Sequence, residues 1–225
     1  MCTSCANLAT TSSNVCGVTS ETHVAGYLDG YLPDDDTLLA ARGRAEELGC
    51  APLEPSAGSA LCFLAASLRA RAVVEIGTGI GVSGLYLLRG MAPDGVLTSI
   101  DIEPEYHRTA RKTFLEAGYP PGRTRLIMGR ALDVLPRLTS GGYDLLFVDA
   151  TLAEYPRYHS LGVDLLRPGG VIAFHGLLAP RTEPVRRDPD ALAARELARA
   201  VREDERLVPS LLPVGHGLLV AAVRA

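Results

Sequence analysis

The chain has 225 residues, of which 47% are hydrophobic and 21% charged, and its formal net charge is −4. This composition is typical of a globular domain, and the negative charge argues against binding to nucleic acid or to an anionic membrane surface. The sequence contains no apolar run of membrane-spanning length and no signal peptide at its start. We therefore expect a cytoplasmic protein with no membrane partner.

Residues 1–20 are rich in Thr, Ser, Asn and Cys, and this composition predicts a disordered tail. Three of the five cysteines lie there, and their odd total argues against a disulfide framework. Cys2 and Cys5 form one C-x-x-C pair but lack the second pair that a structural zinc site needs. We predict one folded domain over residues 21–225.

Two helices are predicted ahead of the first strand. The first begins at the aspartates of residues 34–36, one of which caps it, and ends at Gly49. The second follows Pro55 and carries its leucines on one face.

From residue 72 onward, predicted strands and helices alternate. Strands are expected at residues 72–77, 96–101, 124–129, 143–150 and 169–175. The helices between them are expected at residues 81–91, 103–118, 131–138 and 155–166. The strands are apolar almost throughout, which is typical of parallel strands covered by helices on both faces.

The C-terminal part begins with a predicted helix at residues 188–204, with Asp188 as its cap and Pro189 at its first position. Two strands then follow at residues 206–214 and 217–224, and the short turn between them predicts an antiparallel hairpin. The expected fold class is α/β. It is a doubly wound, seven-stranded, mostly parallel sheet with this hairpin at its end and extra N-terminal helices.

The segment "VVEIGTGIGVSG" joins the first strand to a helix and holds Gly77, Gly79, Gly81 and Gly84. Glycines at this position let the chain turn sharply and let a ligand approach the backbone. Asp101 ends the next strand, where an acid can accept hydrogen bonds from both hydroxyls of a ribose. These features predict a nucleoside-containing ligand.

Two such ligands compete. The spacing Gly79-x-Gly81-x-x-Gly84 matches the dinucleotide fingerprint, which favours an NAD-dependent oxidoreductase. Glu75, two residues before the loop opens, suits a cationic ligand group better than a pyrophosphate. We prefer S-adenosylmethionine, because it carries an ammonium and a sulfonium group and has no phosphate.

The sequence resembles the bacterial branch of the caffeoyl-CoA and catechol O-methyltransferase family over roughly residues 34–223. The resemblance rests on five blocks in order: VVEIGTGIGVSGLYLL, LTSIDIEPE, YDLLFVDA, LLRPGGVIAFHG and LLPVGHGLLVA. It implies a class I, Rossmann-like methyltransferase fold, S-adenosylmethionine as methyl donor, and a homodimer.

The resemblance also implies which residues bind the donor. Glu75, Gly77 and Ser83 would hold the methionine end, Asp101 the ribose and Ile102 the adenine. The full donor-binding set is Leu53, Glu75, Gly77, Thr78, Gly79, Gly81, Ser83, Asp101, Ile102, Gly129, Ala131 and Asp149.

The acceptor site of the resembled family uses a divalent cation held by three oxygen ligands, with a lysine nearby. Here Asp149 keeps one ligand position, but Thr151 and Leu152 replace the second acid and the lysine. His175 and Gly176 replace the remaining aspartate and asparagine. Asp149 and His175 could form a two-ligand site that favours Zn²⁺, Mn²⁺ or Fe²⁺ over Mg²⁺. We nevertheless expect no bound metal.

Without a metal, His175 becomes the candidate general base, with a pKa near neutral and Asp149 to orient it. These two residues are the predicted catalytic pair. The competing interpretation is a histidine that is hydrogen bonded at the strand end and takes no part in chemistry. His216 is interpreted as a turn residue, while Tyr27 and Tyr31 could close over an aromatic acceptor or serve a dimer contact.

The predicted function is S-adenosylmethionine-dependent O-methylation of a small-molecule hydroxyl. The alternative is a donor-binding protein without catalysis, acting as a sensor or an inactive subunit, because the lysine and two metal ligands are missing. An NAD-dependent oxidoreductase is the third interpretation. The expected partners are a small-molecule acceptor and a second copy of the chain, and not nucleic acid.

Overall fold

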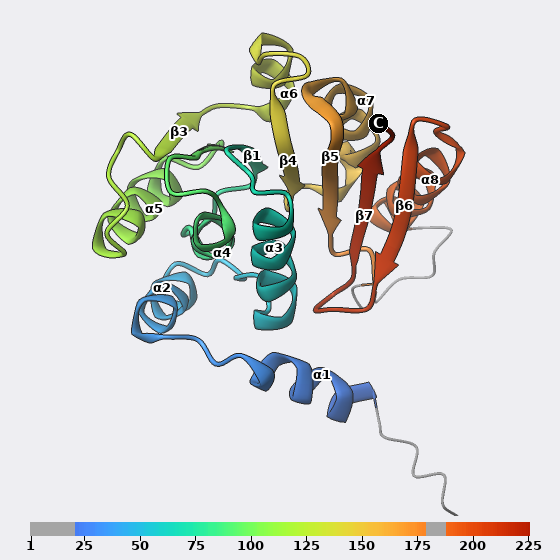
Figure 1. Cartoon of the computed structure of the whole chain (residues 1–225). Helices are drawn as coiled ribbons and strands as arrows, with labels where there is room; N and C mark the ends of the chain where they lie inside the picture. The colour runs from blue at the N-terminus through green and yellow to red at the C-terminus, as the bar shows by residue number, and fades with distance from the viewer. Residues whose placement is uncertain (1–20, 179–187) are drawn as a thin grey trace, which may run out of the picture.

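The computed structural model describes residues 21–178 and 188–225, so the predicted disordered tail lies outside the described residues. A seven-stranded sheet forms the centre of the molecule, in the order β3-β2-β1-β4-β5-β7-β6 (Figure 1). The strands are β1 Ala72–Ile76, β2 Val96–Asp101, β3 Thr124–Met128, β4 Tyr143–Val148, β5 Leu166–His175, β6 Leu207–Leu212 and β7 Leu218–Val223.

Strands β1 to β5 run parallel, whereas β7 runs antiparallel to its two neighbours, β5 and β6. This arrangement confirms the predicted doubly wound sheet and its C-terminal hairpin. Both predictions held because continuous apolar strands need cover on two faces, and because the turn between β6 and β7 is too short for a crossover.

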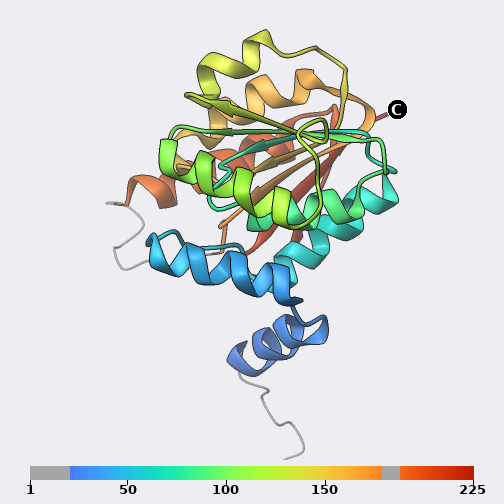
Figure 2. The same cartoon turned by 90° about the vertical axis from the view of Figure 1, so that its left-hand side faces the viewer.

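Helices cover both faces of the sheet, with α2 to α5 on one face and α6 to α8 on the other (Figures 1 and 2). The helices are α1 Glu21–Tyr31, α2 Asp36–Glu47, α3 Pro55–Ser67, α4 Val82–Gly90, α5 Pro104–Glu116, α6 Ala131–Val134, α7 Tyr155–Gly162 and α8 Pro189–Glu203. Within the described residues, no helix is long and apolar enough to cross a membrane.

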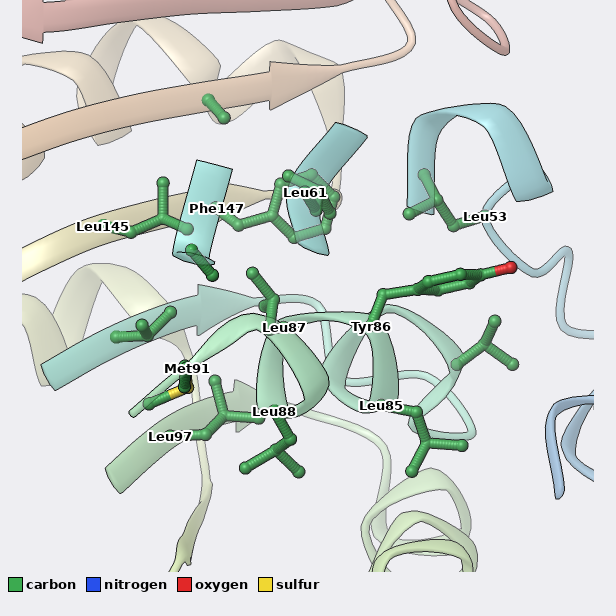
Figure 3. Packing of buried hydrophobic residues seen from close by; sticks show 14 of the residues in the cluster. Leu53, Leu61, Leu85, Tyr86, Leu87, Leu88, Met91, Leu97, Leu145 and Phe147 are labelled. Atoms are coloured by element: carbon green, nitrogen blue, oxygen red, sulfur yellow. The ribbon is translucent and has the colours of Figure 1, made fainter. Parts of the chain in front are cut away.

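Neighbouring residues in the parallel strands are buried on opposite faces of the sheet. Leu145 belongs to the apolar cluster beneath α3 and α4, while Leu146 belongs to the cluster beneath α7 and α8. Figure 3 shows the first cluster, in which Leu61 of α3 and Leu87 of α4 lie with Phe147 of β4. Burial of each such side chain contributes about 1.5–3 kcal/mol, so the two clusters hold the sheet rigidly between its helices.

The helix boundaries follow the predicted capping residues. Asp35 caps α2 by accepting a hydrogen bond from the Leu38 N–H, and Gly49 follows the helix with a φ of +64°. Asp188 caps α8 in the same way, ahead of Pro189 at the first helical position. A cap of this kind contributes about 1 kcal/mol.

Helix α1 has no counterpart among the predicted elements. It extends away from the sheet, beside α2 and α3 (Figures 1 and 2). The Asp29 carboxylate on α1 accepts a hydrogen bond from the Ser56 N–H at 3.0 Å, which joins α1 to the start of α3.

The strand order reverses between β1 and β4, because β2 and β3 lie on one side of β1 and the later strands lie on the other. In open parallel sheets, ligands bind in the crevice at the carboxyl ends of the strands at such a point. The glycine-rich loop follows β1 there, and Asp149 follows β4. The Asp149 N–H donates a hydrogen bond to the Ile76 carbonyl oxygen at 2.9 Å, which joins the two strand ends.

Candidate functional site

Two adjoining cavities of about 390 and 380 Å³ lie at this crevice. Both are within the range of roughly 300–1,000 Å³ that is typical of small-molecule sites. The first is also lined by residues 50–53, and the second by residues 129–131. They form one elongated cleft, because they share wall residues: Gly77, Asp101, Ile102, Ala150 and Thr151.

The close approach of the two strand ends requires glycine at position 77. Gly77 has a φ of +93°, and a Cβ atom there would lie 1.9 Å from the carbonyl oxygen of Asp149. Gly81 also has a positive φ, +91°, where it caps the start of α4. The loop therefore adopts a backbone conformation that side-chain-bearing residues reach only with strain.

The Asp101 carboxylate is fixed in the middle of the cleft. Its Oδ2 accepts a hydrogen bond from the Gly79 N–H, and its Oδ1 accepts one from the Glu103 N–H, both at 2.9 Å. A carboxylate oxygen can accept more than one hydrogen bond. Asp101 therefore retains acceptor capacity for the two hydroxyls of a ribose.

Glu75, which is predicted to hold the methionine end of a donor, lies directly behind the wall of the cleft. Its side chain is fully buried, and its carboxylate accepts hydrogen bonds from the hydroxyls of Ser83 at 2.6 Å and Ser99 at 2.5 Å. Burial raises the pKa of Glu75 to about 7, although these hydrogen bonds lower it. Ser83 itself lines the cleft, so Glu75 acts on the site through Ser83.

Most other predicted donor-binding residues line the cleft. Those in the wall of the first cavity are Leu53, Gly77, Thr78, Gly79, Ser83, Asp101, Ile102 and Asp149. Gly129 and Ala131 line the second cavity. Glu75 and Gly81 are not among the described residues that line the two cavities.

The cleft also contains four residues that the sequence did not assign to the site. Cys50 and Tyr106 line the first cavity, and Glu154 and Tyr158 line the second. Tyr158 donates a hydrogen bond to the Glu154 carboxylate at 2.5 Å. These four residues lie outside the glycine loop and the strand ends, so no motif identified them.

His175 lies between two carboxylates. Its Nδ1 is 3.0 Å from Oδ1 of Asp149, and its Nε2 is 2.9 Å from Oε2 of Glu54. The contact with Asp149 follows from the pairing of β4 with β5, as the sequence predicted. Glu54, the residue before α3, was not predicted, because it is 121 residues away in the chain.

The pKa of His175 also differs from the near-neutral value that the sequence analysis predicted. Burial alone would lower the pKa of His175, but the hydrogen bonds to Asp149 and Glu54 raise it to about 9. Burial of Glu54 is likewise outweighed by its hydrogen bond to His175, which lowers the Glu54 pKa to about 2. His175 is therefore an imidazolium at neutral pH with both ring nitrogens occupied. The near-neutral value was wrong because the second carboxylate was not foreseen.

His216 extends the same cluster. It lies in the predicted turn between β6 and β7, and its Nδ1 pairs with Oε1 of Glu54. The centroids of the His175 and His216 rings are 6.1 Å apart. The His216 side chain is 53% exposed, so the cluster reaches from the buried end of β5 to the surface.

Tyr155 joins the strand ends that carry this cluster. Its hydroxyl accepts a hydrogen bond from the Ala150 N–H at 3.3 Å and lies 3.1 Å from the His175 carbonyl oxygen, to which it donates. The Tyr155 side chain is almost fully buried. This hydroxyl therefore joins the ends of β4 and β5 beyond Val148, together with the contact between Asp149 and His175.

The three-oxygen magnesium site implied by the family resemblance does not fit the residues present. Asp149 is the single carboxylate at its three ligand positions. Thr151 is exposed at the second, and His175 presents imidazole nitrogens at the third, beside Gly176 without a side chain. We therefore assign no role to such a site.

Comparison with known families gives a match over most of the chain. The family model described as O-methyltransferase matches residues 46–224. A protein of Mycolicibacterium vanbaalenii that carries the name O-methyltransferase is 50% identical over 201 residues, which cover 88% of this chain and 89% of the relative.

Solved structures show the same fold. A crystal structure of a Corynebacterium glutamicum protein has a TM-score of 0.83 and 31% identity, and the match covers 91% of this chain and 97% of that one. The O-methyltransferase TomG of Streptomyces achromogenes, solved in complex with S-adenosylmethionine, has a TM-score of 0.79 and 27% identity. That match covers 90% of this chain and 96% of TomG.

Proposed function

The chain belongs to this O-methyltransferase family, and we propose that it transfers the methyl group of S-adenosylmethionine to a hydroxyl of a small molecule. The observation that carries the proposal is the cleft at the reversal of the strand order, with the glycine loop on one side and Asp101 at its centre. The S-adenosylmethionine bound to TomG supports the same donor here.

The two cavities suggest how the donor lies. The methionine end occupies the first cavity, near Ser83 and Asp149, whose carboxylate suits the donor's ammonium group. Asp101 accepts hydrogen bonds from the ribose at the junction of the cavities. The adenine occupies the second cavity, against Ile102 and Ala131. This orientation places the methyl group near the carboxyl end of β4.

The acceptor then binds beside Asp149 and His175, the proposed catalytic pair. Asp149 lines the cleft, while His175 lies behind it and holds the Asp149 carboxylate. Methyl transfer proceeds by in-line displacement: the sulfur–methyl bond breaks as the methyl–oxygen bond forms, S-adenosylhomocysteine leaves, and the hydroxyl proton passes to water. The rate depends on close placement of the two reacting atoms. His175 is thus a positioning residue that holds Asp149, and the donor keeps its contacts with Ser83 and Asp101 when His175 is replaced.

His175→Ala tests this assignment. We expect unchanged S-adenosylmethionine binding by calorimetry and loss of S-adenosylhomocysteine formation with a panel of phenols and catechols. His107→Ala, on α5, is the control and should behave as the wild type in both assays. Wild-type turnover by His175→Ala would contradict the role.

The same assays separate the alternatives. Donor binding without turnover of any hydroxyl in the panel by the wild type would indicate a donor-binding protein without catalysis. Binding of NAD in place of S-adenosylmethionine would indicate an oxidoreductase.

We also propose that the protein is a homodimer through the surface around α1. Tyr27, Tyr31 and Leu32 are between 58% and 69% exposed, and Phe63 on α3 is 70% exposed. The rings of Tyr27 and Tyr31 lie 6.4 Å apart, and exposed apolar side chains on neighbouring helices are typical of interaction surfaces. Sedimentation velocity should show a dimer for the wild type and a monomer for Tyr27→Ser combined with Phe63→Ser.

A further inference from the structure

Three side chains from distant parts of the chain meet beside the cleft. Glu54 precedes α3, His175 ends β5, and His216 lies in the turn between β6 and β7. One nitrogen or oxygen atom from each lies within 4.8 Å of the other two. Nε2 of His175 lies 2.9 Å from Oε2 of Glu54, and Nδ1 of His216 pairs with Oε1 of the same carboxylate.

The turn that carries His216 is attached to both other segments. The Gly215 N–H donates to the Ser56 hydroxyl at 3.0 Å, and the Gly176 N–H donates to the Gly217 carbonyl at 3.0 Å. The Leu178 N–H donates to the carbonyl oxygen of His216 itself at 2.7 Å. These bonds anchor the turn two residues from Glu54 and one residue from His175, so the three side chains are held together by the backbone.

Gly215 leaves the space that the Glu54 carboxylate occupies. A Cβ atom at position 215 would lie 2.4 Å from Oε2 of Glu54, and the φ of Gly215 is +51°. Any larger residue would displace the carboxylate or strain the turn. The absence of a side chain at position 215 therefore makes room for the Glu54 carboxylate in this cluster.

Asp149 orients the central histidine. Its Oδ1 lies 3.0 Å from Nδ1 of His175, so Nε2 is the nitrogen that faces Glu54 and His216. A carboxylate on the second nitrogen of a histidine is the usual support for a metal-binding imidazole, because it fixes the ring and raises its basicity.

We propose that Glu54, His175 and His216 bind one Zn²⁺ ion. The ion takes the place of the proton on Nε2 of His175, which is released to water, because zinc binds the neutral imidazole. Zinc bound tetrahedrally at about 2.0–2.1 Å sets its ligand atoms roughly 3.3 Å apart, and the three candidate ligand atoms here all lie within 4.8 Å of one another. Two imidazoles and one carboxylate favour zinc and its first-row neighbours over Mg²⁺. Three protein ligands leave a fourth position open, and the exposed side chain of His216 gives the ion a path of entry.

This site differs from the three-oxygen site of the resembled family. It shares the position of His175, but Glu54 and His216 come from the start of α3 and the last hairpin, and its donor set is softer. Where the proposed function holds, an acceptor hydroxyl in the open position would lose its proton more readily, because a bound zinc ion lowers the pKa of its oxygen ligand. This effect on the acceptor hydroxyl rests on the proposed function, whereas the metal site does not.

The test is titration of the full-length, chelator-treated protein with Co²⁺, which replaces zinc and gives visible absorption bands in a tetrahedral site. Cys2, Cys5 and Cys16 are first replaced by serine, because their thiols also bind soft metals. We expect one equivalent of Co²⁺ to bind, one equivalent of Zn²⁺ to displace it, and excess Mg²⁺ to leave it in place.

Variants identify the ligands. His216→Ala and Glu54→Gln should weaken Co²⁺ binding by at least about tenfold. His216 is exposed, so its replacement should leave the fold intact, which circular dichroism checks. His107→Ala is the matched control and should bind Co²⁺ as the parent protein does. Absence of the visible bands, or equal affinity in His216→Ala, would overturn the site.

Donor binding and turnover are measured on the same preparations. Co²⁺ binding without methyl transfer would support the metal site and contradict the proposed function. Methyl transfer without Co²⁺ or Zn²⁺ binding would support the function and overturn the metal site.

Discussion

The buried carboxyl of Glu75 makes stability depend on pH. Burial raises its pKa from 4.5 to about 7, although the hydroxyls of Ser83 and Ser99 donate hydrogen bonds to it. Between these two pH values the folded protein holds a proton that the unfolded chain has already lost. The free energy of unfolding therefore falls as pH rises from 4.5 to 7, and this contribution is constant above pH 7.

The size of the effect follows from the pKa. One pKa unit corresponds to about 1.4 kcal/mol, so the rise from 4.5 to about 7 corresponds to about 3 kcal/mol. Glu75→Gln keeps the shape of the side chain and cannot ionise. Its free energy of unfolding should therefore increase relative to the wild type by about 2–3 kcal/mol between pH 5 and pH 8.

Urea unfolding followed by circular dichroism at pH 5 and pH 8 measures this difference. Glu205→Gln, at an exposed position, is the control and should follow the wild type at both pH values. A difference in stability that is the same at both pH values would refute the reasoning, since it would mean that the buried carboxyl titrates normally.

Three further predictions concern the cleft and the cluster beside it. Gly77→Ala should lose at least about 2 kcal/mol of stability in urea unfolding, because its Cβ would lie 1.9 Å from the Asp149 carbonyl oxygen; wild-type stability would show that the loop can move aside. Asp101→Asn should weaken S-adenosylmethionine binding about 10- to 100-fold in calorimetry, because charged acceptors contribute about 1.5–3 kcal/mol, and an unchanged affinity would place the ribose elsewhere. In metal-free protein, the raised pKa of His175 gives a stabilisation that is complete below pH 6.5 and is lost as pH rises through about 9. Urea unfolding of His175→Gln should lack that loss, and a parallel loss in the variant would assign it to another group.

The donor cleft could be predicted from the sequence because its parts follow strand ends. Gly77, Asp101 and Asp149 each stand at or just beyond the carboxyl end of a parallel strand, and such ends meet at one edge of a sheet. The strand pairing confirms this arrangement, and the same logic brings Asp149 beside His175. The register of neighbouring strands sets which residues lie side by side, and the strands themselves can be predicted from the sequence pattern.

The direction of a side chain was harder to predict. Glu75 occupies its expected place in β1, but its carboxylate faces Ser83 and Ser99 behind the cleft. Strand periodicity assigns a face of the sheet to a residue. It does not say whether other protein side chains or a ligand-binding cleft lie next to that residue.

What the sequence by itself determined was the α/β architecture, the order of its elements, the glycine loop and the strand ends that line the cleft. These depend on local periodicity, on turn chemistry and on the pairing of parallel strands. Only the tertiary structure decided the surroundings of His175, because Glu54 and His216 reach it from the start of a helix and from a hairpin turn. Contacts between such segments depend on how helices and hairpin pack on the sheet, and the same packing sets the charge of His175.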